Sequence, residues 1–283
     1  MKKKSENARP KKYPITTVTQ CRVPIFWPMS KPPRSESVDD LVIENKWGRA
    51  IIKRCKLTQV HRNLLDLIFA HHHGIYFDED GSVWLLIDLY EIQKMFQIEE
   101  TNHSWLVEKL DDLTEALFVT ETKHWVITSG IIHKHAYSKT DADHPFNKFG
   151  DNKLYYVVFE SEFMRFFKLD TNLYYEALLD KIIALKYGSS QALARFCLSH
   201  RQVNMKLESI LTKIGVFRSE MTKQQRNNVR KQVLHEAEKL KNDFGIEIKP
   251  MKDKKRLGVF YSQHKKVWFE NPKKMAKDFH AVN

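Results

Sequence analysis

The stretch TKQQRNNVRKQVLHEAEKLKNDFGIEIKPMKDKKRLGVFYS, residues 222–262, decides the fold that the sequence predicts. Thr222 and Gln225 have the spacing of a capping box, and the helical pattern that they open runs to Gly245, a typical stop residue. Two β-prone runs, IEIKP and LGVFYS, then flank the basic turn MKDKKR. The sequence therefore predicts a long helix followed by a hairpin with a strongly basic turn.

The predicted helix has one apolar face and one polar face. The apolar stripe consists of Val229, Val233, Ala237, Leu240 and Phe244. The opposite face carries amides and cations, which are the groups that pair with adenine and guanine edges in a major groove. We expect base-reading side chains at Gln224, Asn227, Asn228, Lys231 and His235. A solvated amphipathic helix is the alternative for this face taken alone.

Cations surround the polar face and continue into the hairpin turn, and a second basic run, KKVWFENPKK, follows. Clustered Lys and Arg side chains neutralise DNA phosphates without reading base sequence. The phosphate contacts expected in this region are Lys223, Arg226, Arg230, Lys249, Lys252, Lys254, Lys255, Arg256, Lys265 and Lys266.

The distribution of charge supports a polyanionic partner. The net charge of the 283-residue chain is +12, but residues 1–56 and 217–283 carry +9 each, whereas residues 57–130 carry −9 and residues 131–216 carry +3. A chain that is basic at both ends and acidic between them indicates separate roles for its parts, with the basic parts facing nucleic acid.

The order of predicted elements indicates an α+β fold with two winged-helix domains in tandem. From Leu57 the patterns run helix, strand, helix, helix, strand, strand, which is the order of a winged helix, and the order recurs in the second half. The proline-rich start, with one short strand at RVPIFW, reads as a flexible arm. We expect a basic arm at residues 1–45, an acidic winged helix at 46–168 and a basic, DNA-binding winged helix at 169–283.

The third helix of the first predicted domain differs from its counterpart. Glu108, Asp111, Asp112 and Glu115 would repel phosphate. Two interpretations remain open, an ordinary acidic surface and a face that binds a second copy or another protein.

The sequence offers little basis for catalysis, metal binding or a membrane span. The three cysteines have no paired spacing, the first residues lack a secretory signal, and no long apolar run occurs, so we expect a soluble, cytoplasmic protein without cofactors. No phosphate-binding glycine loop is present. Consecutive histidines at 71–73 suit a helix end better than a metal site. The motif HKHAY keeps one enzymatic alternative open, a metal-dependent DNA-nicking enzyme acting through Tyr137, His133 and His135.

The run SSQALARF, residues 189–196, opens another predicted helix. Ser190 is the expected N-cap, and a helix N-terminus is also a phosphate site. Because Arg195 lies about 140° around the helix from Ser190, we expect it to bind a second phosphate or a carboxylate of the same domain.

These residues also carry a resemblance. SSQALARF, with PIF at 24–26, YYVVFESEFMRFF, and SH at 199–200, resembles the iteron-type plasmid replication initiators, and most of all the IncP-type broad-host-range initiator. The similarity covers about residues 22–216. It implies two winged-helix domains, binding to origin repeats in double-stranded DNA, DNA melting beside them, self-association through the first domain and recruitment of a host replicative helicase. The acidic third helix departs from this family, in which both domains can touch DNA.

We therefore predict a non-enzymatic, sequence-specific DNA-binding initiator of replication for a plasmid, phage or mobile element. A winged-helix transcriptional regulator is the first alternative, and the nicking enzyme is the second.

Overall fold

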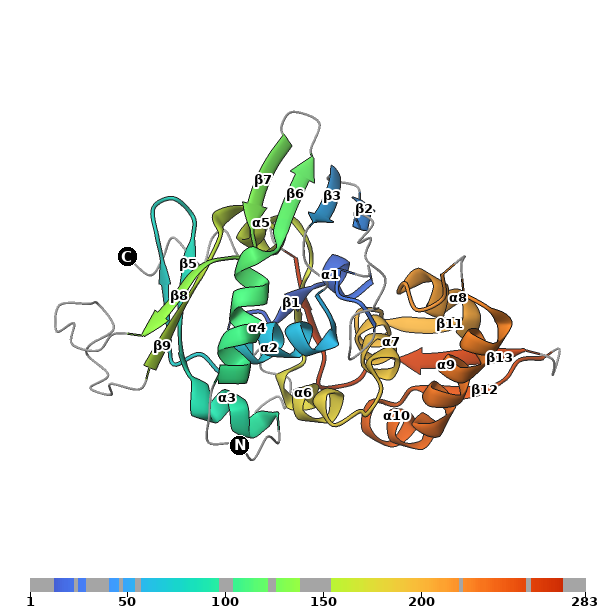
Figure 1. Ribbon diagram of the computed structural model, residues 1–283. Helices are drawn as coiled ribbons and strands as arrows, with labels where there is room; N and C mark the ends of the chain where they lie inside the picture. Colours follow the sequence, from blue (N-terminus) through green and yellow to red (C-terminus); the bar gives the residue numbers. More distant parts are fainter. Residues whose placement is uncertain are drawn as a thin grey trace, which may run out of the picture.

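The computed structural model describes residues 13–22, 25–28, 41–45, 48–53, 57–96, 104–121, 126–137, 154–218, 221–252 and 256–271. Helices and strands are mixed along the chain in an α+β fold (Figure 1). Within the described residues no helix is both long enough and apolar enough to span a bilayer.

The elements fall into two successive groups. The first group contains β1 (Thr16–Thr17), α1 (Val18–Arg22), β2 (Leu41–Asn45), β3 (Gly48–Lys53), α2 (Gln59–Ala70), β4 (Gly74–Phe77), β5 (Val83–Asp88), α3 (Leu89–Met95), α4 (Ser104–Glu115), β6 (Leu117–Glu121), β7 (Val126–Gly130), β8 (Ile132–Tyr137), β9 (Leu154–Phe159) and α5 (Ser161–Leu169). The second contains β10 (Asn172–Tyr174), α6 (Glu176–Ile183), α7 (Gly188–Leu198), β11 (Gln202–Lys206), α8 (Leu207–Lys213), α9 (Lys223–His235), α10 (Ala237–Phe244), β12 (Glu247–Pro250), β13 (Leu257–Ser262) and β14 (Trp268–Glu270).

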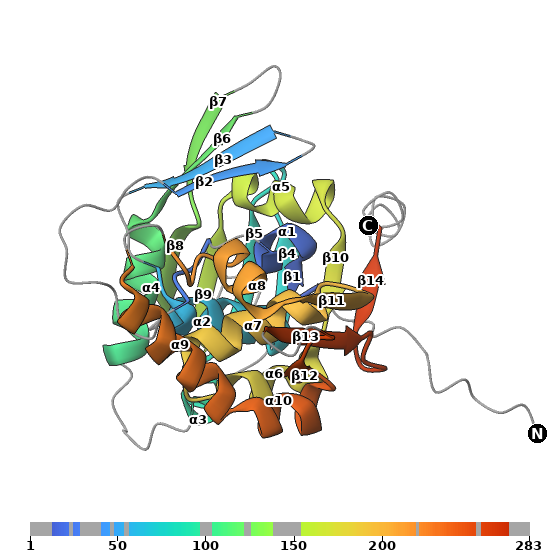
Figure 2. The same cartoon turned by 90° about the vertical axis from the view of Figure 1, so that its right-hand side faces the viewer.

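Four antiparallel sheets connect these elements. Their strand orders are β4-β5-β9-β8, β11-β13-β12, β2-β3-β6-β7 and β1-β10-β14. The sheet β2-β3-β6-β7 stands at the top of Figure 2, above the helices. In the sheet β11-β13-β12, β11, which precedes α8, lies beside β13, and β12, which follows α10, takes an outer place. In the sheet β4-β5-β9-β8, β5, which precedes α3, lies beside β9, and β8 takes an outer place.

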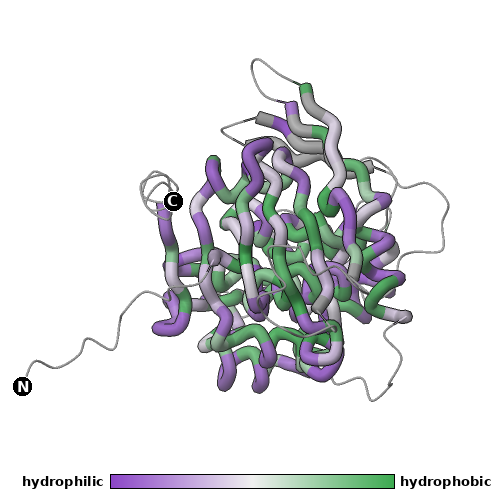
Figure 3. Tube along the Cα trace, turned by 90° about the vertical axis from the view of Figure 1, so that its left-hand side faces the viewer, coloured by the Kyte–Doolittle hydropathy of each residue, from purple (hydrophilic) through white to green (hydrophobic). Residues whose placement is uncertain are grey.

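Helices α2 and α7 form the centre of the molecule. Eleven of the 12 residues of α2 and all 11 residues of α7 are buried. One continuous hydrophobic core extends from these helices to both groups of elements, through residues such as Phe69, Phe159, Leu193 and Phe244. Hydrophobic segments gather inside the body in Figure 3, with hydrophilic segments around them. Burial on this scale is the main source of stability for the fold.

The expectation of a flexible arm over residues 1–45 is wrong for residues 13–22, and also for residues 41–45, which form β2 and pair with β3. Strand β1 pairs with β10 through Thr16 and Leu173, and α1 contacts α7. Thr16 and Thr17 are fully buried. Residues 1–12 and 29–40 lie outside the described residues. The arm was predicted from its prolines and charges, but a two-residue strand that pairs with a distant segment leaves no local periodicity to read. The described residues of RVPIFW contain the end of α1 at Arg22 and a bridge from Trp27 to Thr58, in place of the expected strand.

The expected N-cap at Ser190 is also wrong. Helix α7 begins at Gly188 with Tyr187 in the N-cap position, so Ser190 is the third helical residue and is fully buried. The carboxylate of Glu236 instead accepts hydrogen bonds from the backbone N–H groups of Lys186 (2.7 Å) and Tyr187 (3.3 Å). Glu236 lies between α9 and α10, so the helix predicted to be continuous over 222–245 is interrupted where it holds the start of α7.

Candidate nucleic-acid interface

Helix α9 begins as the sequence predicts. The Thr222 hydroxyl accepts a hydrogen bond from the Gln225 N–H (3.2 Å), and the Gln225 side-chain carbonyl accepts one from the Thr222 N–H (2.7 Å). This capping box satisfies two backbone groups at the helix start. On the inner side Val233 is buried, and Leu240 and Phe244 of α10 continue the buried stripe. The predicted stop is confirmed at Gly245, whose φ of 71° suits a residue without a side chain.

Four of the five predicted base-reading residues lie exposed on one face of α9. They are Gln224, Asn228, Lys231 and His235, spaced so that each follows the last by about one turn. The Gln224 amide N–H donates to the Asn228 side-chain carbonyl at 3.3 Å, which orients both amides. Asn227 is half-buried and accepts a hydrogen bond from Arg230 Nη1 at 2.6 Å, so it positions a cation and does not lie freely on the outer face.

Arg226 and Arg230 flank this face in fixed positions. Both guanidinium groups lie over the Phe217 ring, at 5.8 and 5.7 Å from its centroid. Arg226 Nη2 also donates to the Arg218 carbonyl (2.9 Å), and Arg230 Nη2 donates to Glu208. Stacking on an aromatic ring reduces the side-chain entropy that binding would otherwise cost. Lys223 is exposed on the first turn.

The β12-β13 hairpin carries the next set of expected cations. Lys249 is exposed, lies 4.8 Å from the Phe260 ring centroid and donates to Glu247 at 2.7 Å. Lys252, Arg256, Lys265 and Lys266 are exposed, whereas Lys254 and Lys255 lie outside the described residues. Gly258 lets the strand pack closely, because a Cβ there would meet the Phe260 ring at 2.8 Å.

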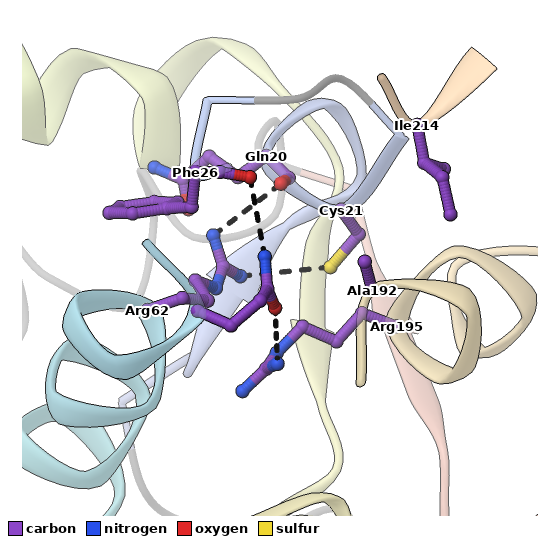
Figure 4. Close-up of a pocket in the computed structure, with 8 residues that line it drawn as sticks. Gln20, Cys21, Phe26, Arg62, Ala192, Arg195 and Ile214 are labelled. Carbon is purple, nitrogen blue, oxygen red and sulfur yellow. Dashed lines mark hydrogen bonds between the residues drawn. The ribbon is translucent and has the colours of Figure 1, made fainter. Parts of the chain in front are cut away.

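The predicted phosphate contact at Arg195 is wrong. The side chain is 3% exposed and belongs to a buried network (Figure 4). Arg195 Nε donates to Asp66 (2.9 Å), Nη1 to Gln59 (2.9 Å) and Nη2 to Asn63 (2.6 Å). A DNA phosphate cannot reach this group. Arg195 does have a carboxylate partner, which was the alternative prediction. That carboxylate, Asp66, belongs to α2 and not to the predicted second domain. Ser190 is excluded as a phosphate contact by the same burial.

Among the described residues of this network, Asp66 is the only carboxylate, and it forms ion pairs with two arginines. Its second cation is Arg62, whose Nε lies 2.9 Å from Asp66, and the Tyr175 hydroxyl also donates to it at 2.8 Å. Burial opposes the charge on Arg62, but Asp66, Tyr175 and Cys21 together outweigh burial and raise the pKa of the guanidinium above its usual range. Beside the arginines, burial raises the pKa of the Cys21 thiol, so Cys21 stays protonated. The network joins α1, α2 and α7.

The histidines of the HKHAY motif have protein partners. His133 Nδ1 lies 2.8 Å from Glu160, and His135 lies 2.9 Å from Asp111 and 3.1 Å from the Tyr155 hydroxyl. No group of three or more His, Cys, Asp or Glu side chains among the described residues has the arrangement of a metal site. The side chain of Tyr137 lies outside the described part.

Two carboxylates of the acidic helix α4 contact side chains of the same protein. Asp111 contacts His135, and Asp112 contacts both His61 (2.8 Å) and Lys109 (2.8 Å). Asp111 is nevertheless exposed, as are Glu108 and Glu115. Part of the acidic character of α4 is therefore structural, since it fixes α4 against α2 and β8.

Sequence reasoning missed three residues that position the interface. Phe217 supports both arginines of α9, Glu208 contacts Arg230, and Glu236 connects the α9-α10 break to α7. Glu208 and Glu236 look like ordinary surface carboxylates in the sequence, and only the fold gives them partners. The sequence does contain a signal for Phe217, an aromatic residue in the short connection between α8 and α9.

Comparisons with known proteins leave the family open. No protein-family model matches the sequence, and no curated protein matches it. A solved structure, that of RctB domains 2-3 (RctB-155-483), is 13% identical over 83% of this chain and 95% of that chain, with a TM-score of 0.48. The resemblance to IncP-type initiators therefore stays a prediction.

Proposed function

We propose that this chain is a sequence-specific DNA-binding protein that places α9 in the major groove of duplex DNA. The observation that carries the proposal is the exposed face formed by Gln224, Asn228 and Lys231, with stacked arginines on its flank and the basic β12-β13 hairpin beyond it. Amides can pair with adenine edges and cations with guanine edges, while the hairpin cations contact phosphates. An ordinary solvated helix would not need guanidinium groups fixed on an aromatic ring.

We propose further that each group of elements is a winged helix. In the second group, α7, β11, α8, α9-α10, β12 and β13 follow the order helix, strand, helix, helix, strand, strand, and the sheet order β11-β13-β12 supports this assignment. The first group supports it less closely. There α2, β5, α3, α4, β8 and β9 have the same order, with β4 and the sheet β2-β3-β6-β7 as additions.

On the sequence resemblance, we propose that the DNA target is a set of origin repeats and that the protein initiates replication of a plasmid, phage or mobile element. Self-association through the first group, recruitment of a host helicase and a cytoplasmic location belong to this proposal. A transcriptional regulator would share the DNA contacts. Selecting bound fragments from the replicon that encodes the protein separates the two, because tandem direct repeats support the initiator and a palindrome at the protein's own promoter supports the regulator.

The DNA interface itself is tested by salt. With roughly 6 to 10 phosphate contacts, affinity should fall on the order of 10³- to 10⁵-fold between 50 and 200 mM salt. Fluorescence anisotropy with a selected duplex measures this. A shallow dependence, or affinity unchanged in a Lys223→Gln, Lys252→Gln, Lys265→Gln variant, would contradict the proposal.

We also propose that no step requires chemistry by the protein. Tyr137→Phe, and His133→Ala combined with His135→Ala, should leave DNA binding and origin function intact after correction for any loss of stability. Incubation of supercoiled origin DNA with Mg²⁺ or Mn²⁺ checks this, because a nicked or covalently attached product that disappears in Tyr137→Phe would establish the nicking enzyme instead.

A further inference from the structure

A small hollow lies between α9 and the β12-β13 hairpin. Its volume is about 170 Å³, and its lining residues are Lys206, Leu207, Glu208, Arg230, Arg256 and Leu257. A single water takes up about 30 Å³, so the hollow has room for a larger polar group. Its lining residues belong to the end of β11, the start of α8, one side of α9 and the start of β13.

The lining is strongly cationic. Three of its six residues are Lys or Arg, and Glu208 is its one acid. Two of the cations lie beside each other at the β11-β13 ladder, because Lys206 pairs in register with Gly258 and Arg256 directly precedes β13. Lys206 and Arg256 are both exposed, so a ligand can reach them from solvent. Charge and access together favour a small anion.

Arg230 is the best-positioned group of this set. The Phe217 ring and the Asn227 carbonyl hold its guanidinium, and its Nε is buried without a hydrogen-bond partner among the described residues. Nη2 donates to Glu208, whose side chain is 56% exposed. An exposed ion pair of this kind is weak, contributing about 0 to 1 kcal/mol, so a stronger acceptor can replace Glu208.

We propose that Lys206, Arg230 and Arg256 form a binding site for one backbone phosphate of DNA, and that Glu208 is the counter-ion which this phosphate displaces from Arg230. The inference rests on the proposed function, since the ligand is DNA lying along α9. A strand that follows the exposed face of α9 toward the β12-β13 hairpin passes over the hollow, because these two elements form its walls. Bidentate contact by a guanidinium that is already oriented suits a phosphate.

The test compares two carboxylate variants that change the net charge equally. Glu208→Gln should raise duplex affinity about two- to fivefold, because the competing acceptor is removed. Glu238→Gln on α10, also an exposed glutamate, is the matched control and should change affinity by much less. Arg230→Gln should weaken binding and reduce the slope of log affinity against log salt concentration by about 0.9. Thermal unfolding of each variant verifies that it is folded.

The decisive measurement is the double variant Glu208→Gln, Arg230→Gln. If Glu208 acts by occupying Arg230, its substitution should give no gain once Arg230 is absent. An equal gain in the presence and absence of Arg230, or an equal gain in Glu238→Gln, would overturn the inference while leaving DNA binding by α9 intact. Failure of the unsubstituted protein to bind any selected duplex would overturn the proposed function as well. Inorganic phosphate carries the same group without a nucleic acid and can serve as a competitor. Added up to 50 mM at constant ionic strength, it should reduce duplex binding by less in Arg230→Gln than in the unsubstituted protein.

Discussion

The interior around α7 and the outer face of α9 use the same side chains in opposite ways. In the interior, Arg195 donates to Gln59, Asn63 and Asp66, and every group of its guanidinium is directed at the protein. On α9, Arg230 has one amide and one exposed carboxylate as partners, and Gln224 and Asn228 face outward. An arginine beside amides therefore does not by itself mark a DNA contact. Whether such an arginine can contact DNA depends on its burial and on how many hydrogen-bond partners it has within the protein.

The largest effect should follow from breaking the interior network. Asp66→Asn removes the charge that compensates both Arg62 and Arg195, and these guanidiniums are buried. Leaving such charges unpaired costs about 3 to 5 kcal/mol. Urea unfolding followed by circular dichroism should show this loss, with the DNA salt dependence of the folded fraction unchanged. A variant as stable as the parent protein would mean that the buried network contributes little to the fold.

The sequence predicted the outer face better than the interior, and the reason is the range of the interactions involved. The capping box of Thr222, the apolar stripe around Val233 and the stop at Gly245 depend on residues within a few turns of one another, so their spacing is visible in the sequence. The pairing of Arg195 with Asp66 joins residues 129 positions apart. No local pattern encodes that distance, and a lone arginine on a small-residue helix looked like a surface cation.

The same limit applies to β1 and to Glu236. Strand β1 exists because β10 lies beside it, and Glu236 accepts hydrogen bonds from the residues just before α7 because α9 ends close to the start of α7. In both cases the interacting segment is distant in the sequence and lies close only in the folded protein. Single elements such as α2 and α4, in contrast, were readable because each has its own periodicity. The strand β4 between α2 and β5, and the pairing of β6 and β7 with β2 and β3, were not predicted.

The next effect concerns base reading. Asn228→Ala should relax preference at one or two base pairs by about 1 to 3 kcal/mol, because its amide is exposed on the outer face. Lys252→Gln, a change in the hairpin turn, should weaken binding to all sequences alike. Affinity for a panel of single-base variants of the selected duplex separates the two. If Lys252→Gln altered the preference and Asn228→Ala did not, α9 would not be the reading helix.

A smaller effect is expected at the start of α9. Thr222→Ala removes a side-chain cap that the structure contains, and the usual cost is about 0.5 to 2 kcal/mol. Thermal unfolding at fixed pH measures it. DNA affinity should fall along with stability, because the base-reading face begins at Gln224, two residues after Thr222. Thr222→Ser, which keeps the hydroxyl, is the control and should remain close to the parent protein. Equal losses in both variants would show that packing, and not the cap, stabilises this end.

The smallest effect should be at Ser190, the residue first expected to be a cap. Its hydroxyl is fully buried and has no hydrogen-bond partner among the described residues, whereas the Thr222 hydroxyl is exposed and bonded. A buried polar group without a partner destabilises the folded state, so Ser190→Ala should leave stability unchanged or raise it by up to about 1 kcal/mol. The side chain shrinks by one atom, which limits any loss of packing. Parallel thermal unfolding of Ser190→Ala and Thr222→Ala provides the comparison, with opposite signs expected for two hydroxyls that both lie near a helix start. A loss at Ser190 as large as that at Thr222 would mean that the buried hydroxyl has a partner such as an ordered water, and the contrast between interior and surface would then not extend to the caps.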